Sequence, residues 1–424
     1  MALIKTPVKG MQDFLPADMR LREHVLSAIK TTYATYGFSL METPAMEHIE
    51  NLTSKQGGDN EKLIFKVLKR GADLARALDK LPDAELADSG LRYDLTVPLA
   101  RYYAANSGQL PAPFKALQIG SVWRADKPQK GRFRQFTQCD IDILGDKSNL
   151  AEITLLEATA QMLSALLGEV DIRDFTIRVN DRRILMGAAL ASGFAADEVP
   201  GVLISLDKAD KIGWDGVADE LKANGFAADV VDPYVALFAD SEGVGVDEFC
   251  APLVGSALDE AVVTNLSQIV ATVTPLLPAG AKLVFDPTLV RGMGYYTGPI
   301  FEVGLDGYGF SVAGGGRYDE MIGKFSGQDT PACGFSIGFE RIITIMKDQL
   351  GAAGAAVAEG SVAILVAAGV DATQKAQAFA HAAELRAAGK TVTVVPLRKN
   401  LGRQIAELEA QGYQEFEKVR PQRG

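Results

Sequence analysis

The strongest constraint on the fold is a pair of long alternating runs on either side of one short basic segment. From residue 91 to 145 apolar and polar side chains alternate in short runs that predict strands, including residues 116–124 and 133–144. A period of two is typical of a β-strand with one buried face. Pro128 and Gly131 between the runs favour a turn. The sequence therefore predicts two antiparallel strands joined by the loop from residue 125 to 132.

The remaining pattern divides the 424 residues into a core, an insertion and a smaller C-terminal domain. Residues 1–180 and 279–348 predict one antiparallel sheet flanked by helices. Residues 181–278 are mainly helical in pattern, so we expect an insertion into this sheet. Residues 349–361 are rich in small residues and predict a linker. A strand–helix–strand–helix pattern in residues 362–424 predicts a small α/β domain with one parallel pair of strands. The predicted fold class is α+β.

Composition excludes several classes of protein. The net charge is -11, which argues against a protein that coats nucleic acid nonspecifically, although a local basic patch is compatible with it. No apolar run approaches the roughly 18 residues that cross a bilayer, and the N-terminus lacks the apolar segment of a signal peptide, so we expect a cytoplasmic protein without membrane contact. The three cysteines are widely spaced and fit reduced thiols better than disulfides or a structural metal.

The predicted hairpin loop collects positive charge in this acidic chain. Five basic residues and one acidic residue lie between Arg124 and Phe136. Alternation predicts that Arg132, Arg134 and Phe136 share one face, with Arg124 beside them across the hairpin. Guanidinium groups that converge repel one another unless an anion lies between them, and phosphate oxygens suit their forked donors. A solvated basic hairpin tip is the alternative explanation of this segment taken alone.

Two aspartates follow on the second strand of the hairpin. Asp140 and Asp142 alternate with apolar residues, and Gln138 lies on the same side. An acidic face on a central strand is costly unless a cation or several hydrogen-bond donors lie against it. Together with Asp94 and Thr96, these residues could hold a substrate that carries an amino group and a second polar end. Internal salt bridges to the arginines remain an equal alternative.

Three glycine-rich stretches, at residues 291–298, 314–319 and 334–338, occupy the second half of the predicted core. The first two each carry an arginine, Arg291 and Arg317, and so suggest further cations for an anionic ligand. Glycine permits close approach of the backbone to a ligand. None of these stretches matches the phosphate-binding Walker loop. Residues 334–338 formally match the Gly-x-Ser-x-Gly nucleophile elbow, but the only histidine after them is His381 in the C-terminal domain. A serine hydrolase is therefore disfavoured.

Taken together, five segments in order resemble the class II aminoacyl-tRNA synthetases, and specifically the histidyl-tRNA synthetase family. Residues 38–47, 124–145 and 334–341 resemble the three class II motifs. Residues 91–96 and 291–298 resemble signatures of the histidine-specific family. The resemblance extends from about residue 9 to 347. It implies a class II antiparallel sheet flanked by helices, with a helical insertion and a C-terminal domain like an abbreviated anticodon-binding domain.

The resemblance also implies a definite reaction. The family joins histidine to ATP, releasing pyrophosphate, and then transfers the histidyl group from the adenylate to the 3′ end of its tRNA. Fixed cations lower the barrier because negative charge accumulates on phosphorus oxygens. The resemblance predicts ATP as substrate, with magnesium bridging its phosphates and no dedicated metal site in the protein. It also predicts histidine and tRNA as partners, and a homodimer.

The residues that the resemblance assigns to the site form four groups. The catalytic cations would be Arg124 and Arg291. Histidine would be bound by Asp94, Thr96, Arg124, Gln138, Asp142, Arg291, Tyr295 and Tyr296. ATP would be bound by Arg124, Arg132, Phe136 and Arg341, with adenine between the last two. The acceptor end of tRNA would meet Gln129 and Lys130. A carboxylate and a phenol suit the two ring nitrogens of histidine, since a pocket built for such bonds rejects analogues that lack them.

The C-terminal region departs from the family pattern. In the family this domain continues with further strands and a helix, whereas the sequence reaches Gly424 soon after its second predicted helix. Arg398, Lys399 and Arg403 nevertheless supply positive charge for a module that would read the anticodon. Gly294 stands where the histidine signature commonly has an aspartate.

The main rival is a noncatalytic paralogue resembling the regulatory subunit of ATP phosphoribosyltransferase, which binds histidine as an effector. A histidine sensor has no chemical need for Arg124, Phe136, Arg291 and Arg341 together, and this favours the synthetase. A class II synthetase for another amino acid is disfavoured by Asp142 and the adjacent tyrosines. Resemblance of fold alone does not establish function.

Overall fold

The computed structural model describes residues 3–53, 60–82, 85–128, 133–291, 294–350 and 360–421. The chain forms two compact units, which are Met1–Gln12 with Ser27–Thr344, and Asp13–Leu26 with Ile345–Gly424. The first unit holds the large sheet, and the second holds a small sheet near the C-terminus.

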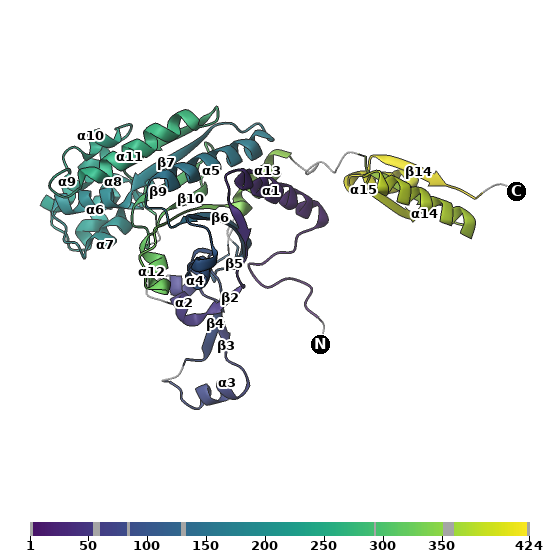
Figure 1. The fold of residues 1–424 in the computed structure, drawn as a ribbon, viewed down its shortest axis with the longest axis horizontal. Coiled ribbons are helices and arrows are strands. Elements are labelled where there is room, and N and C mark those ends of the chain that lie inside the picture. The colour runs from purple at the N-terminus through teal and green to yellow at the C-terminus, as the bar shows by residue number, and fades with distance from the viewer. Residues whose placement is uncertain are drawn as a thin grey trace. The chain divides into compact units, whose positions relative to one another are not determined.

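The large sheet is built from strands far apart in the sequence (Figure 1). Its strands are β1 (Ser39–Met41), β5 (Phe114–Trp123), β6 (Gln135–Leu144), β7 (Phe175–Asp181), β8 (Ala281–Phe285), β9 (Pro299–Gly304), β10 (Ser311–Arg317) and β11 (Ala332–Ile337). Within the described residues their order is β1-β5-β6-β11-β10-β9-β7-β8. The six strands from β5 to β7 are antiparallel. The edge pairs β1-β5 and β7-β8 are parallel, so the sheet is mixed, with the predicted antiparallel arrangement at its centre.

The predicted hairpin is confirmed. Strands β5 and β6 pair in register from Phe114 with Leu144 to Trp123 with Gln135. On one face of β6, Cys139, Ile141 and Ile143 are fully buried. This is the face expected to pack inward, because apolar residues alternate along the strand.

Helix α5 (Leu150–Gly168) covers this apolar face and packs on β6 and β11. It is the one helix of the described residues that is long and apolar enough to cross a membrane, but most of it is buried inside the protein, as in a core helix. Its Glu152 forms a buried ion pair with Arg317 of β10, at 2.5 Å. Gly314 and Gly316 of β10, at positions of the other parity, therefore lie on the opposite face of the sheet.

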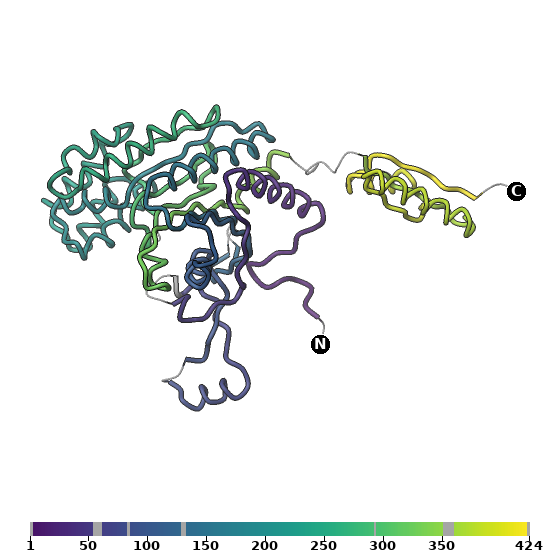
Figure 2. The backbone as a smooth tube through the Cα atoms, in the orientation of Figure 1, coloured from purple at the N-terminus to yellow at the C-terminus, as the bar shows by residue number. Residues whose placement is uncertain are grey.

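The segment between β7 and β8 is helical, as predicted, and Figure 2 traces it away from the sheet and back again. Its helices are α6 (Arg182–Ser192), α7 (Val199–Leu206), α8 (Ala209–Ala223), α9 (Ala228–Ala239), α10 (Val246–Cys250) and α11 (Glu260–Val273), followed by the 3₁₀ turn Thr274–Leu276. Tyr234 is fully buried between Phe194 and Phe238, with ring centroids 5.2 and 5.0 Å away. Edge-on aromatic packing of this kind gives the insertion a core of its own.

A smaller sheet, in the order β2-β4-β3, leads into the site. It contains β2 (Met46–His48), β3 (Lys66–Leu68) and β4 (Ala87–Leu91), with α2 (Ile49–Thr53), a 3₁₀ turn (Asn60–Leu63) and α3 (Gly71–Leu78) between them. After β4, the buried Arg92 donates to the Thr43 carbonyl at 2.6 Å and to the Ser121 carbonyl at 2.9 Å. These bonds fasten the end of β4 to β5, and so position the Asp94 that follows.

A helix occupies part of the stretch that alternation had assigned to short strands. It is α4 (Thr96–Asn106), followed by the 3₁₀ turn Ser107–Gln109, and it packs on α12 (Glu320–Ser326). Val97, Leu99 and Ala100 are buried. Tertiary burial therefore overrode the local pattern, which is common for short apolar runs. The remaining helices are α1 (Pro16–Thr35) and α13 (Phe339–Leu350).

The C-terminal sheet contains one strand more than predicted. Its elements are β12 (Val362–Val366), α14 (Ala372–Ala387), β13 (Val392–Pro396), α15 (Leu401–Ala410) and β14 (Glu415–Val419). The three strands are parallel, in the order β13-β12-β14. The predicted parallel pair was therefore incomplete. Strand β14 escaped prediction because it lies at the sheet edge, where charged residues such as Glu415 and Lys418 are tolerated.

Candidate functional site

A polar row crosses the large sheet on the face opposite α5. Residues paired in register project to the same side of a pleated sheet, so side chains on neighbouring strands meet along such rows. In register, one row contains Gln118, Asp140, Ser336, Gly314, Glu302 and Arg178. Beside it, Asp142 pairs with Gly334 of β11. Acids and hydrogen-bonding groups thus lie in the centre of a sheet where apolar residues would be expected.

The carboxylates of β6 are buried and hydrogen-bonded. Ser336 Oγ donates to Asp140 Oδ1 at 2.6 Å, and Gln138 Nε2 donates to Asp140 Oδ2 at 3.2 Å. Tyr318 OH donates to Asp142 Oδ1 at 2.5 Å. The Asp142 side chain lies across β11 so closely that a Cβ on Gly334 would be 2.0 Å from Oδ1. Glycine at this position therefore makes room for Asp142.

Four buried acceptor atoms on this side of the sheet have no hydrogen-bond partner within the described residues. They are Asp94 Oδ2, Gln118 Oε1, Gln138 Oε1 and Asp142 Oδ2. The other Asp94 oxygen accepts from the Val97 backbone at 3.3 Å. A buried acceptor without a partner costs about 1–3 kcal/mol. All four atoms are acceptors, and each lacks a donor. The site is therefore complementary to a cationic ligand with several N–H groups.

Burial also changes the acidity of these carboxyl groups. It raises the pKa of Asp94 to about 6, although Arg124 opposes the change. It raises the pKa of Asp140 to about 7, with a further contribution from Asp94. The pKa of Asp142 is raised well above its ordinary value by burial and by the charge of Asp140. A bound cation would offset the mutual repulsion of these three acids.

The variant Asp140→Asn tests this picture without a ligand. Because the pKa of Asp140 lies above its unfolded value of about 4, the folded protein holds a proton that the unfolded chain has lost between about pH 4 and 7, and stability falls as the pH rises through that window. Asparagine removes this dependence. Between pH 5 and pH 8, Asp140 should lower the free energy of unfolding of the wild type by about 2–4 kcal/mol. Asp140→Asn should not show this loss.

Chemical unfolding at both pH values measures this difference for Asp140→Asn. The exposed Asp88→Asn is the matched control, and its pH dependence should equal that of the wild type. An Asp140→Asn profile parallel to the wild-type profile would contradict the assignment.

Tyrosines close one end of the polar row. The rings of Tyr295 and Tyr296 have centroids 4.8 Å apart, and Tyr295 lies 6.0 Å from Tyr318. Burial raises the pKa of Tyr295 well above the ordinary value, the neighbouring Tyr296 and Asp94 add to the rise, and the Thr96 side chain opposes it. The structure thus brings the predicted Thr96, Tyr295 and Tyr296 to the end of the row where Tyr318 meets Asp142. Tyr318 itself was not predicted, because its partner lies 176 residues away in the sequence.

Arg291 reaches the same face of the sheet from the segment before β9. Its guanidinium lies over Gly314, where an added Cβ would be 2.5 Å from Nη1. Nη1 donates to Glu302 Oε2 at 2.7 Å, and the charge of Arg291 opposes the rise that burial causes in the pKa of Tyr296. The glycine-rich strand was expected to admit a ligand, but here the glycine makes room for a side chain of the protein.

The other predicted cations have different partners. Arg124 Nε donates to the Tyr93 carbonyl at 2.9 Å, and its Cζ is 5.1 Å from the centre of the Phe136 ring. Arg341 lies 5.5 Å from the Phe310 ring and donates to Ser311. The Thr137 backbone donates to Glu340 at 3.1 Å, so the start of α13, which carries Arg341, is adjacent to Phe136 on β6. Gln129, Lys130 and Arg132, also predicted for the site, lie outside the described residues.

Arg317 has a structural role. The glycine-rich stretch 314–319 had suggested a second cation for a ligand. Instead, Arg317 is 7% exposed and binds both oxygens of Glu152 on the face opposite the site. It also donates to the Ser148 carbonyl at 3.0 Å. These bonds fix the start of α5 against β10.

Comparison with known proteins places the chain in a family. The sequence model of the family described as histidyl-tRNA synthetase matches residues 10–342. The histidine--tRNA ligase of Leifsonia xyli subsp. xyli is 49% identical over 350 residues, which are 81% of this chain and 80% of that protein. The crystal structure of histidyl-tRNA synthetase from Nostoc sp. PCC 7120 has a TM-score of 0.78 at 26% identity, and the match covers 97% of this chain and 90% of that one.

A second solved structure is similar in fold. It is described as an ATP phosphoribosyltransferase regulatory subunit/histidyl-tRNA synthetase from Bacillus halodurans C, with a TM-score of 0.77. The match covers 99% of each chain. At 18% identity this likeness concerns the fold alone.

Proposed function

The chain belongs to the histidyl-tRNA synthetase family, and from this premise we propose that the polar face of its large sheet activates histidine with ATP and passes it to tRNA. The protein is thus a ligase of the aminoacyl-tRNA synthetase class. The observation that carries the proposal is the group of four buried acceptor atoms without partners. Histidine offers an ammonium group and ring N–H donors, which is the set of donors that such a site requires.

In the proposed complex, histidine lies along β6. Its ammonium group donates to Asp94 and Gln138, whose unpartnered oxygens are buried. Its imidazole lies at the other end, against Asp142 and the tyrosines. Tyr318 fixes Asp142 by hydrogen bonding to Oδ1 and leaves Oδ2 for the ring. The closed tyrosine end selects histidine, because an amino acid without ring donors leaves Asp142 Oδ2 unpaired.

ATP is proposed to bind at the Phe136 end of the same row. Adenine stacks on Phe136, and Arg341 approaches from the start of α13. Magnesium enters with the triphosphate as part of the substrate. A carboxylate oxygen of histidine attacks the α-phosphorus, the bond to the leaving pyrophosphate breaks, and the electron pair of that bond stays on the pyrophosphate oxygen. Arg124 and Arg291 approach the reacting centre from opposite sides and stabilise the charge that develops on the phosphorus oxygens.

The rival function, histidine sensing by a noncatalytic paralogue, is less well supported. A protein whose description includes a regulatory subunit shares the fold, but at only 18% identity. The relative with 49% identity is a histidine--tRNA ligase. Arg124 and Phe136 stack on one another beside the polar row. A sensor of histidine alone does not need this pair.

ATP–pyrophosphate exchange, measured across the twenty amino acids with saturating magnesium, tests the proposed function. Exchange stimulated by histidine alone is the expected result. Histidine binding without any exchange would overturn the synthetase and favour the sensor. Omission of magnesium should stop the exchange, because the triphosphate charge then stays uncompensated.

The C-terminal unit is proposed to contact the tRNA. Residues 361–424 carry nine lysines and arginines against six acids, in a chain of net charge -11. Arg398 and Arg403 both pair with Glu407, at 2.6 and 2.9 Å, so the positive charge assigned to these residues is partly neutralised. Lys399 is exposed beside them.

Removal of residues 351–424 should raise the KM for tRNA at least about tenfold, which is about 1.4 kcal/mol of lost binding. The KM for histidine in pyrophosphate exchange should stay within about twofold, because the polar row lies in the other unit. Steady-state aminoacylation and exchange measure the two effects separately. Equal losses in both assays would refute a specific role in tRNA binding.

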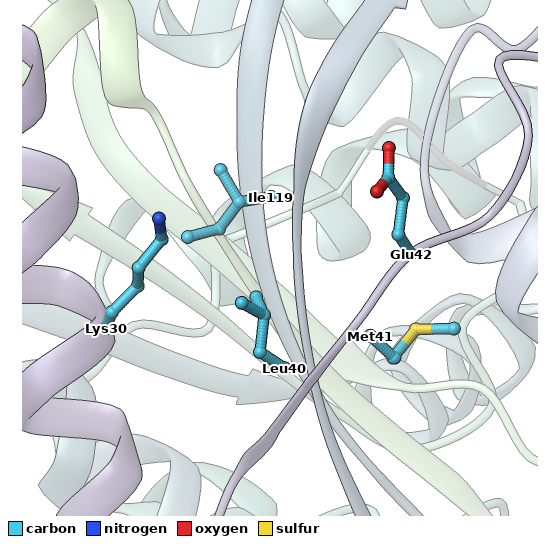
Figure 3. Close-up of a pocket in the computed structure, with 5 residues that line it drawn as sticks. All are labelled: Lys30, Leu40, Met41, Glu42 and Ile119. Carbon is cyan, nitrogen blue, oxygen red and sulfur yellow. The ribbon is translucent and has the colours of Figure 1, made fainter.

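A second copy of the chain is proposed to cover the edge of the large sheet at β1. A hollow of about 370 Å³ lies there, and Figure 3 shows the residues that line it, which are Lys30, Leu40, Met41, Glu42 and Ile119. Leu40 is 59% exposed, which is unusual for a leucine on an edge strand. Sedimentation should give twice the chain mass of 45.3 kDa, and the monomer mass at micromolar concentration would contradict the proposal.

The cytoplasm is the proposed location. Cys139, Cys250 and Cys333 are buried and form no disulfide. Reduced thiols of this kind fit a reducing compartment. Cell fractionation tests this placement, and recovery from the secreted fraction would contradict it.

A further inference from the structure

A chain of ion pairs extends outward from Arg291 across the sheet. Glu302 Oε2 accepts from Arg291 at 2.7 Å, and Glu302 Oε1 accepts from Arg178 Nη2. Arg178 Nη1 in turn donates to Asp286 Oδ2 at 3.2 Å. Glu302 and Arg178 are paired in register on β9 and β7, and Asp286 follows directly after β8. The chain therefore links the proposed catalytic cation to three neighbouring strands.

The three groups beyond Arg291, which are Glu302, Arg178 and Asp286, are each held from two sides. The two oxygens of Glu302 bind different guanidinium groups, so the carboxylate cannot rotate without losing one of them. At the far end, Asp286 Oδ1 accepts from the Thr288 hydroxyl at 2.6 Å and from the Thr288 backbone at 2.9 Å. The chain thus ends at a backbone group rather than in solvent. An arginine side chain anchored in this way loses its rotational freedom before substrate binds, which is the condition for preorganised catalysis.

The charges of the chain balance, with two guanidinium groups against two carboxylates. On its outer side lies a small hollow of about 80 Å³, whose lining includes Arg178, Asp207, Thr288 and Glu302. Asp207, from the turn between α7 and α8, lines this hollow together with Glu302, and burial raises its pKa. The Arg291 guanidinium itself lies over Gly314, which pairs with Ser336 of the polar row.

We propose that Glu302 is a positioning residue for adenylate formation, and that it acts by holding the Arg291 guanidinium over Gly314 while Arg178 and Asp286 hold Glu302. The inference rests on the proposed function, because it concerns the same reaction. The side chains are only 17–33% exposed, so water screens these ion pairs in part and the chain also contributes to the stability of the fold. The double-mutant cycle described below separates this contribution from positioning.

Glu302→Gln is the sharpest test, since it preserves size and removes the charge. We expect kcat for histidine-dependent pyrophosphate exchange to fall about 10–100-fold, the scale associated with misplacement of one catalytic group. The KM for histidine and for ATP should change less than about threefold, because Glu302 touches neither substrate. Arg178→Lys keeps the charge but loses the two guanidinium nitrogens that bind Glu302 and Asp286, and it should give a smaller fall in kcat. The exposed Asp306→Asn, just beyond β9, is the matched control and should leave kcat unchanged.

A double-mutant cycle separates positioning from a structural role. If Glu302 acts only through Arg291, Glu302→Gln should cause no further loss in an Arg291→Ala background. Additive losses, or a normal kcat for Glu302→Gln, would overturn the inference. If Glu302→Gln does not fold, the same cycle with Arg178→Lys distinguishes the two roles. Absence of exchange in the wild type would instead overturn the proposed function, so the two failures are distinguishable.

Discussion

Replacement of Asp142 with asparagine should abolish histidine-dependent pyrophosphate exchange while ATP binding persists. Asp142 Oδ1 is occupied by the Tyr318 hydroxyl at 2.5 Å, and Oδ2 is buried without a partner. An asparagine amide would place a donor where the imidazole also presents one, so a buried pair of donors would be left facing each other. We expect kcat/KM for histidine to fall about 10⁴-fold, the scale at which sites built around a hydrogen bond reject a mismatch. Asp142→Ala should give a similar loss.

Exchange kinetics and a fluorescent ATP analogue measure the two properties of this variant. The exposed Asp88→Asn serves as the control for a change in charge, and should match the wild type in both. Gly334→Ala supplies an independent check. Its new Cβ would collide with Asp142 Oδ1, and should cause the same loss without a change in charge. Unaltered histidine activation in Asp142→Asn would refute the assignment of the imidazole to this end of the row.

Replacement of Arg124 with alanine should lower kcat for exchange about 10²–10³-fold, the usual effect of removing one donor to a developing oxyanion. The Arg124 guanidinium is fixed at Nε by the Tyr93 carbonyl and lies 5.1 Å from the Phe136 ring. Arg124→Lys keeps the charge, but a single ammonium group cannot both bind the Tyr93 carbonyl and present several donors to the phosphate. We therefore expect it to recover only part of the loss.

Single-turnover formation of the adenylate measures the chemical step in the Arg124 variants. Calorimetric binding of histidine reports on the loss of the cation near Asp94, whose pKa Arg124 lowers against the effect of burial. Arg76→Ala is the control, because Arg76 is 71% exposed on α3 and pairs only with Asp73 among the contacts described. A chemical step as fast in Arg124→Ala as in the wild type would remove Arg124 from the catalytic group.

Local sequence pattern was sufficient to predict parts of the site that depend on one strand. Alternation placed Phe136, Gln138, Asp140 and Asp142 on a common face, and the structure confirms the hairpin and the contact between Gln138 and Asp140. Alternation failed where burial depends on distant elements. Thr96 begins a helix rather than a strand, and β14 was taken for a tail because an edge strand needs few apolar residues.

Other features could not be predicted because they depend on the register between strands far apart in the sequence. Tyr318 and Asp142 are 176 residues apart, and Arg178 and Glu302 are 124 residues apart. Nothing in the neighbourhood of either residue indicates its partner. The glycine-rich stretch 314–319 shows the same limit. Its composition indicated close approach, but only the fold shows that Gly314 receives Arg291 and that Arg317 turns away to Glu152.

The sequence by itself determined the strands, their apolar faces, the hairpin and the kinds of side chain available for chemistry. These follow from period-two alternation and from residue type, which are properties of short segments. Tertiary structure alone decided which of these side chains meet, which cation faces the acids and which is used to hold the fold together. Strand order and register decide such contacts, and both result from the packing of the whole sheet against α5 and the insertion rather than from any single segment.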